Sequence, residues 1–203
     1  MRTYLRVSRG RLEEVKAEVV REQPLAIYVN GSRFLTLLCS PFQLEALVVG
    51  YLWMEKVIAG LEDIVSLDVS DVDGRADVTL AQPVELPTER ILTSGCGGGI
   101  TFRIDPRLFT RVESSLRVRP AQLAARLKDL FVEAIHYRAS RGIHGAALTD
   151  GERLLLVAED VGRHNAIDKI AGYMHLNKIG PEGKSFYTTG RLTSEMVIKC
   201  VQM

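Results

Sequence analysis

The sequence of 203 residues has no long uninterrupted apolar run and no excess of charge of either sign. Its most apolar stretch, residues 44–59, is broken by Glu45, Glu55 and Lys56, so we do not expect it to span a membrane. The first residues lack the apolar core of a secretory signal peptide. The formal net charge is +1 with acids and bases interspersed, which suits neither a nucleic-acid-binding stripe nor a polybasic membrane arm. We therefore expect no membrane and no nucleic acid among the partners.

Cysteine is scarce as well, because the chain holds only Cys39, Cys96 and Cys200. This odd and widely spaced set does not suit a disulfide scaffold and is typical of a protein of the reducing cytoplasm. Apolar neighbours predict that Cys39 and Cys200 are core residues. Around Cys96 the sequence has no clustered ligands for zinc and no Walker lysine, and Ile100 stands where a dinucleotide fingerprint needs glycine. We expect no intrinsic metal.

Alternating and helix-spaced apolar residues predict an α/β protein, α+β overall, whose second half is a three-layer core. Asn30-Gly31 predicts a hairpin turn because both positions tolerate positive φ. Ser40 is expected to cap a helix that starts at Pro41. Strands are expected at residues 4–7, 15–20, 25–29, 34–38, 64–69, 76–80, 146–148, 154–157 and 185–188, and further helices from 121, over 162–177 and from 193.

A boundary near residue 115 divides the expected fold into two domains. Residues 1–115 are expected to form an α+β N-terminal domain that includes the Cys96 loop, and residues 116–203 the three-layer core. The last expected helix runs to Met203, so we expect the carboxyl-terminal end of that core to be missing.

The most informative segment is the glycine-rich run at 93–99, with Cys96 at its centre. Glycine at 95 and at 97–99 leaves a thiol accessible and uncovers backbone N–H groups that can stabilise a thiolate. A persulfide carrier needs an accessible sulfur, a lowered thiol pKa and little steric bulk. A flexible turn with an inert cysteine explains the composition about equally well, and a hydrolase or redox protein that pairs Cys96 with a histidine also stays open.

A second polar segment, residues 159–169, joins a predicted strand to a predicted helix. Asp160 is expected to cap this helix, and Gly162 leaves the first-turn amides open. Arg163 and His164 add donors at the positive end of the helix dipole, an arrangement suited to phosphate. Plain capping would by itself explain the aspartate. We favour the anion site because several polar groups converge at one helix start.

Two more positions extend this expected site. Gly190-Arg191 repeats the order of strand, glycine and arginine before a helix, so the two helix starts are expected to form one crevice for an anionic ligand. His144 is a candidate for the same crevice, although a single histidine there is also typical of a structural residue. His164 and Asp168 are four residues apart, so the carboxylate is expected to fix the imidazole tautomer unless the two form a simple surface pair.

These segments together resemble the formate dehydrogenase accessory sulfurtransferase family, FdhD. The matching segments are Pro24 to Asn30, Ser40-Pro41, Thr93 to Gly97, His144 to Ala147, Glu159 to Lys169 and Ser194 to Val197. The resemblance implies a cytoplasmic sulfurtransferase that takes sulfur from a cysteine desulfurase as a persulfide on Cys96. It implies that the sulfur passes to the molybdenum bis(molybdopterin guanine dinucleotide) cofactor, bound as a client, for the formate dehydrogenase apoenzyme.

The resemblance also implies a cytidine-deaminase-like core, a smaller α+β N-terminal domain and a homodimer. The zinc signature of the deaminases is absent, because no glutamate stands two residues after His144 and no Pro-Cys-x-x-Cys occurs, so no zinc deaminase activity is expected. The sequence departs from the family where Gly99 replaces the second cysteine of its common Cys-x-x-Cys loop, and where the family continues past the helix that ends here.

Two hypotheses about function follow. In the first, Cys96 carries sulfur, while Gly162, Arg163, His164, Gly190, Arg191 and His144 bind the guanine-nucleotide part of the cofactor. In the second, the protein is a non-catalytic chaperone that binds the cofactor and escorts it to formate dehydrogenase.

Overall fold

The computed structural model describes residues 2–86, 91–92, 100–101 and 111–203 of the chain. The strands are β1 (Arg2–Ser8), β2 (Arg11–Ala17), β3 (Gln23–Val29), β4 (Ser32–Cys39), β5 (Ile64–Ser70), β6 (Arg75–Leu80), β7 (Ile91–Leu92), β8 (Ile100–Thr101), β9 (His144–Thr149), β10 (Leu154–Asp160) and β11 (Ser185–Thr188). The helices are α1 (Leu44–Met54), the 3-10 helix η1 (Leu61–Asp63), α2 (Pro120–Glu133), α3 (Ile135–Ser140), α4 (Arg163–Leu176) and α5 (Ser194–Gln202).

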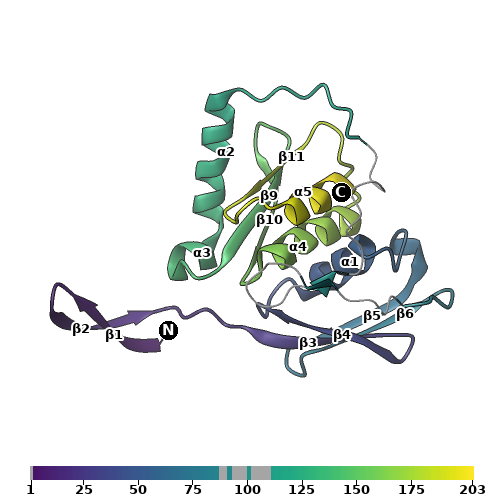
Figure 1. Cartoon of the computed structure of the whole chain (residues 1–203), viewed down its shortest axis with the longest axis horizontal. Helices are drawn as coiled ribbons and strands as arrows, with labels where there is room; N and C mark the ends of the chain where they lie inside the picture. The colour runs from purple at the N-terminus through teal and green to yellow at the C-terminus, as the bar shows by residue number, and fades with distance from the viewer. Residues whose placement is uncertain (1, 87–90, 93–99, 102–110) are drawn as a thin grey trace.

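A four-stranded sheet in the order β4-β3-β6-β5 forms one side of the molecule (Figure 1). Leu25, Ile27 and Val29 alternate along β3 and are buried in the core beside α1. The predicted turn at Asn30-Gly31 is confirmed, with φ of 49° and 79°, and it sets the antiparallel pairing of β3 with β4.

A second sheet, in the order β10-β9-β11, lies between helices on its two faces (Figure 1). Ala146 and Leu148 of β9 pack in a cluster with residues of α4. Ala147, between them in the sequence, packs in a cluster with Leu130 of α2. Because successive strand residues point to opposite faces, this alternation confirms the predicted three-layer α/β core. Strand β11 spans the predicted residues 185–188.

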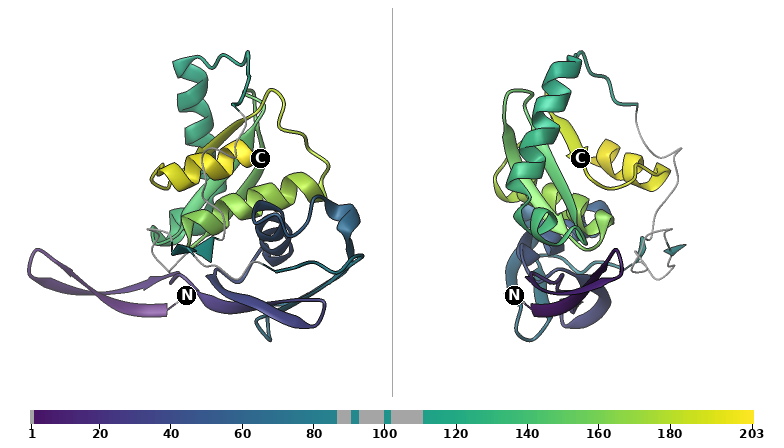
Figure 2. Two further views of the ribbon diagram at one scale, coloured as in Figure 1. Left: turned by 45° about the vertical axis from the view of Figure 1, so that its right-hand side comes forward. Right: turned by 90° about the vertical axis from the view of Figure 1, so that its left-hand side faces the viewer.

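Helix α4 lies between α1 and α5 and joins the two sheets into one body (Figure 2). The α1–α4 crossing depends on two glycines. A Cβ atom on Gly50 would lie 1.7 Å from the backbone oxygen of Asp168, and one on Gly172 would lie 1.8 Å from that of Ala46. Only glycine allows the two helix backbones to approach this closely.

Two sequence-based expectations about where elements begin and end are wrong. Helix α1 begins at Leu44 with Gln43 as its N-cap, so Ser40 does not cap it. Ser40 is instead buried, and its backbone N–H donates to the carboxylate of Asp160, far along the chain. Strand β2 covers Arg11–Ala17 rather than 15–20, because it pairs with β1 around a turn whose residues 9 and 10 have positive φ.

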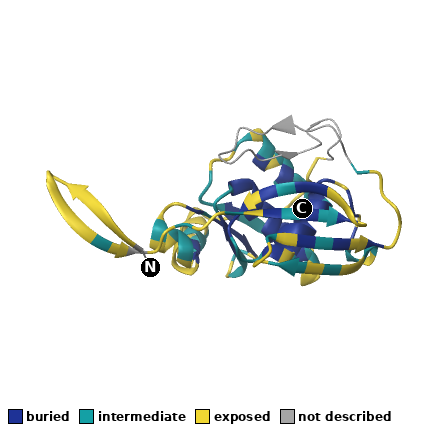
Figure 3. Cartoon of the chain, turned by 90° about the horizontal axis from the view of Figure 1, so that it is seen from below, coloured by how far each residue is buried: buried dark blue, intermediate teal, exposed yellow. Residues whose placement is uncertain are grey.

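The β1–β2 hairpin, called the arm below, projects from the rest of the molecule and is exposed along almost its whole length (Figures 1 and 3). Within the described ranges, no helix has both the length and the apolar character needed to cross a membrane.

Candidate functional site

Cys96 lies outside the described residues, between two short strands that are described. These strands pair antiparallel, with Leu92 opposite Ile100 and Ile91 opposite Thr101. Leu92 and Ile100, which precede and follow the undescribed residues 93–99 in the sequence, are therefore cross-strand neighbours.

The other two cysteines are poor nucleophiles. Cys39 is fully buried, and burial, reinforced by the nearby charge of Asp160, raises the pKa of its thiol to about 12. Burial also raises the pKa of Cys200 to about 12. Because the thiolate is the reactive form, neither cysteine is suited to accept sulfur at neutral pH.

Arg163 is the centre of the polar cluster that the sequence predicted. It is the first residue of α4, after Gly162 as N-cap, and it is only 4% exposed. Its Nε and Nη2 atoms are buried, and no hydrogen-bond partner for them lies among the described residues. A buried guanidinium with unpaired donors is a position where an anion would be bound strongly.

The second glycine-arginine turn lies directly against this arginine. A Cβ atom on Gly190 would lie 3.0 Å from the Cβ of Arg163, so the absence of a side chain at 190 allows the two turns to touch. The N–H of Gly190 donates to Thr188 Oγ1 at 3.0 Å, which holds the turn after β11. Nearby in the sequence, Thr193 Oγ1 at the start of α5 is buried, again with no partner in the described part of the chain.

His144 also belongs to this cluster. It begins β9 and stands opposite Asp160 in the antiparallel register with β10. Burial lowers its pKa first, the positive charge of Arg163 lowers it further, and Asp160 opposes them, with Arg191 adding a smaller decrease. The imidazole is therefore neutral at pH 7. The structure thus places Gly190 against Arg163, and His144 within reach of the charges of Arg163 and Arg191. The crevice itself stays a prediction.

Asp160 holds the turn that places Arg163. Its Oδ1 accepts hydrogen bonds from the N–H of Gly162 at 2.8 Å and from Asn165 Nδ2 at 2.9 Å. Its Oδ2 accepts from the N–H of Ser40 and forms an ion pair with Lys169 Nζ at 2.6 Å, and both side chains of that pair are fully buried. The prediction that Asp160 is the N-cap of α4 is therefore wrong, because the N-cap is Gly162. Asp160, at the end of β10, instead bonds both the start of α4 and Ser40.

His164 and Asp168 do not bond each other as expected. His164 Nε2 lies 3.2 Å from Glu195 Oε2, and Asp168 forms an ion pair with Lys199. The physical reason is α5, which packs on α4 and presents Glu195 and Lys199 one turn apart. Burial and then the charges of Lys199 and Arg163 lower the pKa of His164 to about 4, against the opposing effect of Glu195.

The sequence analysis missed the polar residues that support the cluster. Asn165, Lys169 and Lys199 are all buried, and each bonds a carboxylate on another turn or helix. For Asn165 and Lys169 the available signal was the high share of polar and charged residues at 163–169, in a helix that also carries buried isoleucines. In the described ranges no three His, Cys, Asp or Glu side chains are placed to hold a metal ion.

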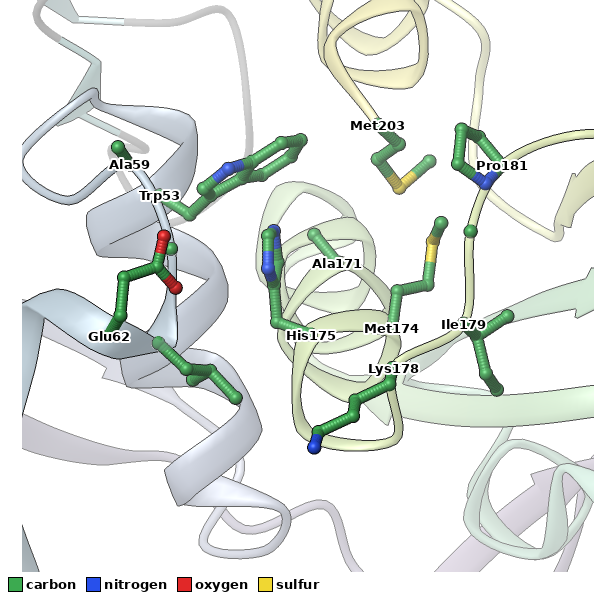
Figure 4. A pocket seen from close by; sticks show the side chains of 13 residues that line it. Trp53, Ala59, Glu62, Ala171, Met174, His175, Lys178, Ile179, Pro181 and Met203 are labelled. Atoms are coloured by element: carbon green, nitrogen blue, oxygen red, sulfur yellow. The ribbon is translucent and has the colours of Figure 1, made fainter.

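A separate cavity of about 500 Å³ lies between the end of α1, η1 and the carboxyl-terminal end of α4 (Figure 4). Trp53, Glu62, Met174, His175 and Met203 are among its lining residues. The rings of Trp53 and His175 are 4.5 Å apart between centroids. Of the predicted site residues that the structure describes, none is among those that line it.

Comparisons with known proteins agree on one family. The model of the FdhD/NarQ family matches residues 20–203. The chain is 34% identical over 209 residues to the sulfur carrier protein FdhD of Bacillus subtilis, covering 100% of the chain and 80% of that protein. It is 32% identical over 207 residues to the protein of the same name from Staphylococcus haemolyticus, covering 99% and 78%. A crystal structure of a candidate formate dehydrogenase accessory protein from Desulfotalea psychrophila is similar with a TM-score of 0.77 at 26% identity, covering 100% of this chain and 78% of that one.

Proposed function

The chain belongs to the FdhD/NarQ family, and from this membership we propose that it is a sulfurtransferase that carries sulfur in the maturation of formate dehydrogenase in the cytoplasm. The observation that carries the proposal is the match of the whole chain to proteins named sulfur carrier protein FdhD. The donor is a cysteine desulfurase, and the client is the molybdenum bis(molybdopterin guanine dinucleotide) cofactor of the formate dehydrogenase apoenzyme.

Cys96 is the sulfur-bearing residue. The high pKa values of Cys39 and Cys200 support this assignment, because they leave Cys96 as the remaining thiol of the chain. Its thiolate attacks the terminal sulfur of the donor's persulfide. A new S–S bond forms on Cys96, the donor's S–S bond breaks, and the donor's cysteine leaves as a thiolate.

The release of sulfur follows from Gly99. With glycine there, the loop has no second thiol at that position to form a disulfide and so reduce the departing sulfur. When the terminal sulfur passes to the cofactor, the S–S bond electrons stay with Cys96 as its thiolate. The two electrons that convert the sulfur to sulfide then come from the client molybdenum.

The polar cluster binds the cofactor's phosphates. Arg163, with two buried nitrogens that have no partner among the described residues, and Arg191 supply positive charge. Gly162 and Gly190 shape the two turns, and their own N–H groups are engaged by Asp160 Oδ1 and Thr188 Oγ1. The neutral imidazole of His144 can donate a hydrogen bond beside them. His164 acts indirectly, because its ring is already engaged by Glu195.

Loading the protein with a cysteine desulfurase and L-cysteine tests sulfur carriage. Peptide mass mapping is expected to place one added sulfur atom on Cys96. Cys96→Ala is expected to lose it, and Cys200→Ala, the matched control, to keep it. A persulfide that persists in Cys96→Ala would refute the proposal.

The second candidate is a non-catalytic chaperone for the cofactor. It is favoured by Arg163, whose buried Nε and Nη2 have no partner in the described ranges and could bind the cofactor without any thiol chemistry. The two candidates differ in one pair of variants. A chaperone would still support formate dehydrogenase maturation as Cys96→Ser but not as Arg163→Ala. A sulfur carrier would fail as either variant.

A further inference from the structure

The arm formed by β1 and β2 exposes apolar side chains to solvent. Val7 pairs with Leu12 across the hairpin, and Leu5 lies on the same face two residues before Val7. These side chains are 66–72% exposed. An isolated two-stranded hairpin is only marginally stable in water. An exposed apolar face on such a hairpin indicates a surface that is covered in an assembly.

The arm is also basic. Residues 2–17 contain five basic and two acidic side chains, a net charge of +3. Both acidic residues lie on β2, so β1 carries arginines and no acid. Among the described strands, β1 pairs only with β2, which leaves its other edge open.

The opposite end of the molecule has the complementary properties. Residues 61–86 contain seven acidic side chains and one basic side chain, a net charge of −6. Strand β5 lies at the outer position of the four-stranded sheet and pairs with β6 alone in the described part of the chain. Val65 on β5 is 67% exposed, and Val72, in the turn after it, is 90% exposed.

We propose that the arm docks on a second copy of this chain, where β1 adds to the open edge of β5. Both strands are seven residues long. Strand addition satisfies the unpaired backbone groups of both edges, and the positive arm meets a negative edge. Because the arm and β5 lie at opposite ends of the molecule, the pairing occurs between copies rather than within one (Figure 1). Two copies that exchange arms close a two-fold dimer with two identical contacts.

Exchanged charges test the contact without disturbing the arm. Arg6 stands opposite Glu13, so the double variant Arg6→Glu/Glu13→Arg keeps that cross-strand pair and the arm's net charge. It places negative charge on β1. Asp68→Lys places positive charge at an exposed position of β5. Arg117→Glu, at an exposed position outside both surfaces, is the control.

The measurement is the dimer dissociation constant of the whole chain by analytical ultracentrifugation, with no donor or cofactor present, so its outcome is independent of sulfur carriage. Each interface variant alone is expected to raise this constant at least about tenfold, because like charges then face each other in both contacts. An equimolar mixture of the two variants is expected to restore the wild-type value, since each arm then meets an edge of opposite charge. The control is expected to change nothing.

Two results would overturn the proposal. The first is that the wild-type chain stays monomeric over the accessible concentration range, whether or not its arm binds anionic vesicles. The second comes from crosslinking, with a photo-crosslinking residue in place of Leu5 and a mixture of isotopically light and heavy chains. Crosslinks are expected between copies, from position 5 of one copy to residues 64–80 of the other. Crosslinks within one copy, or to another element, would contradict the docking.

Discussion

Arg163→Met is expected to stabilise the protein while it removes the anion site. Arg163 is 4% exposed, yet its Nε and Nη2 atoms lack hydrogen-bond partners in the described part of the chain. A buried donor left without a partner costs about 1–3 kcal/mol, so the two together cost about 2–6 kcal/mol. Methionine preserves much of the apolar stem and has no donor to satisfy.

We expect this substitution to raise the free energy of unfolding by about 1–3 kcal/mol, because lost packing and the loss of the remaining guanidinium contacts offset part of the gain. At a slope of about 2 kcal/mol per molar urea, the unfolding midpoint moves up by about 0.5–1.5 M. The assay uses buffer free of phosphate and sulfate. Arg117→Met, at an exposed position, is the control and is expected to stay within about 0.5 kcal/mol of wild type.

Pyrophosphate is expected to make wild type more stable to urea than Arg163→Met, the reverse of their order in anion-free buffer. Wild type gains about 4.1 kcal/mol at a thousandfold excess of ligand over its dissociation constant, which exceeds the expected advantage of the variant, whereas Arg163→Met gains nothing. A midpoint that falls in anion-free buffer when Arg163 is replaced would mean that the guanidinium is already satisfied in the folded protein. That result would refute the reasoning.

Three further predictions concern the scaffold and the titratable groups. Gly172→Ala is expected to lower the urea-derived stability by about 3 kcal/mol, because its Cβ would lie 1.8 Å from a backbone oxygen of α1; a gain in stability would contradict the close crossing. The pKa of His164 is about 4 in the folded protein against an ordinary 6.5, so the unfolded state binds a proton first as the pH falls. The stability of wild type relative to His164→Gln should therefore decrease as the pH is lowered from 6.5 to about 4. A difference in urea midpoints that stays constant over this range would refute the prediction. At about pH 8, iodoacetamide is expected to label Cys96 and, because burial raises their pKa values, to spare Cys39 and Cys200; rapid labelling of either in peptide maps would contradict this.

Turns, helices and strands of the described chain were predictable where adjacent residues determine the backbone conformation. Asn30-Gly31 forms its hairpin because both residues accept positive φ, and β11 coincides with the predicted strand. Ser40 shows the opposite case. Its sequence, a serine before proline, is typical of a helix N-cap, but its backbone N–H bonds Asp160, 120 residues away. A local pattern contains no information about such a partner.

The sequence by itself determined that Gly162-Arg163 would open a helix after a strand, that Gly190-Arg191 would follow another strand, and that Cys39 would be buried. The assignment of Cys96 as the sulfur-bearing residue also comes from the sequence alone, and it stays a prediction because Cys96 lies outside the described residues. Only the tertiary structure decided that Gly190 touches Arg163 and that His164 bonds Glu195 instead of Asp168. The physical reason is that desolvation and choice of hydrogen-bond partner depend on packing between elements distant in the sequence, whereas turn and helix signals depend on adjacent residues.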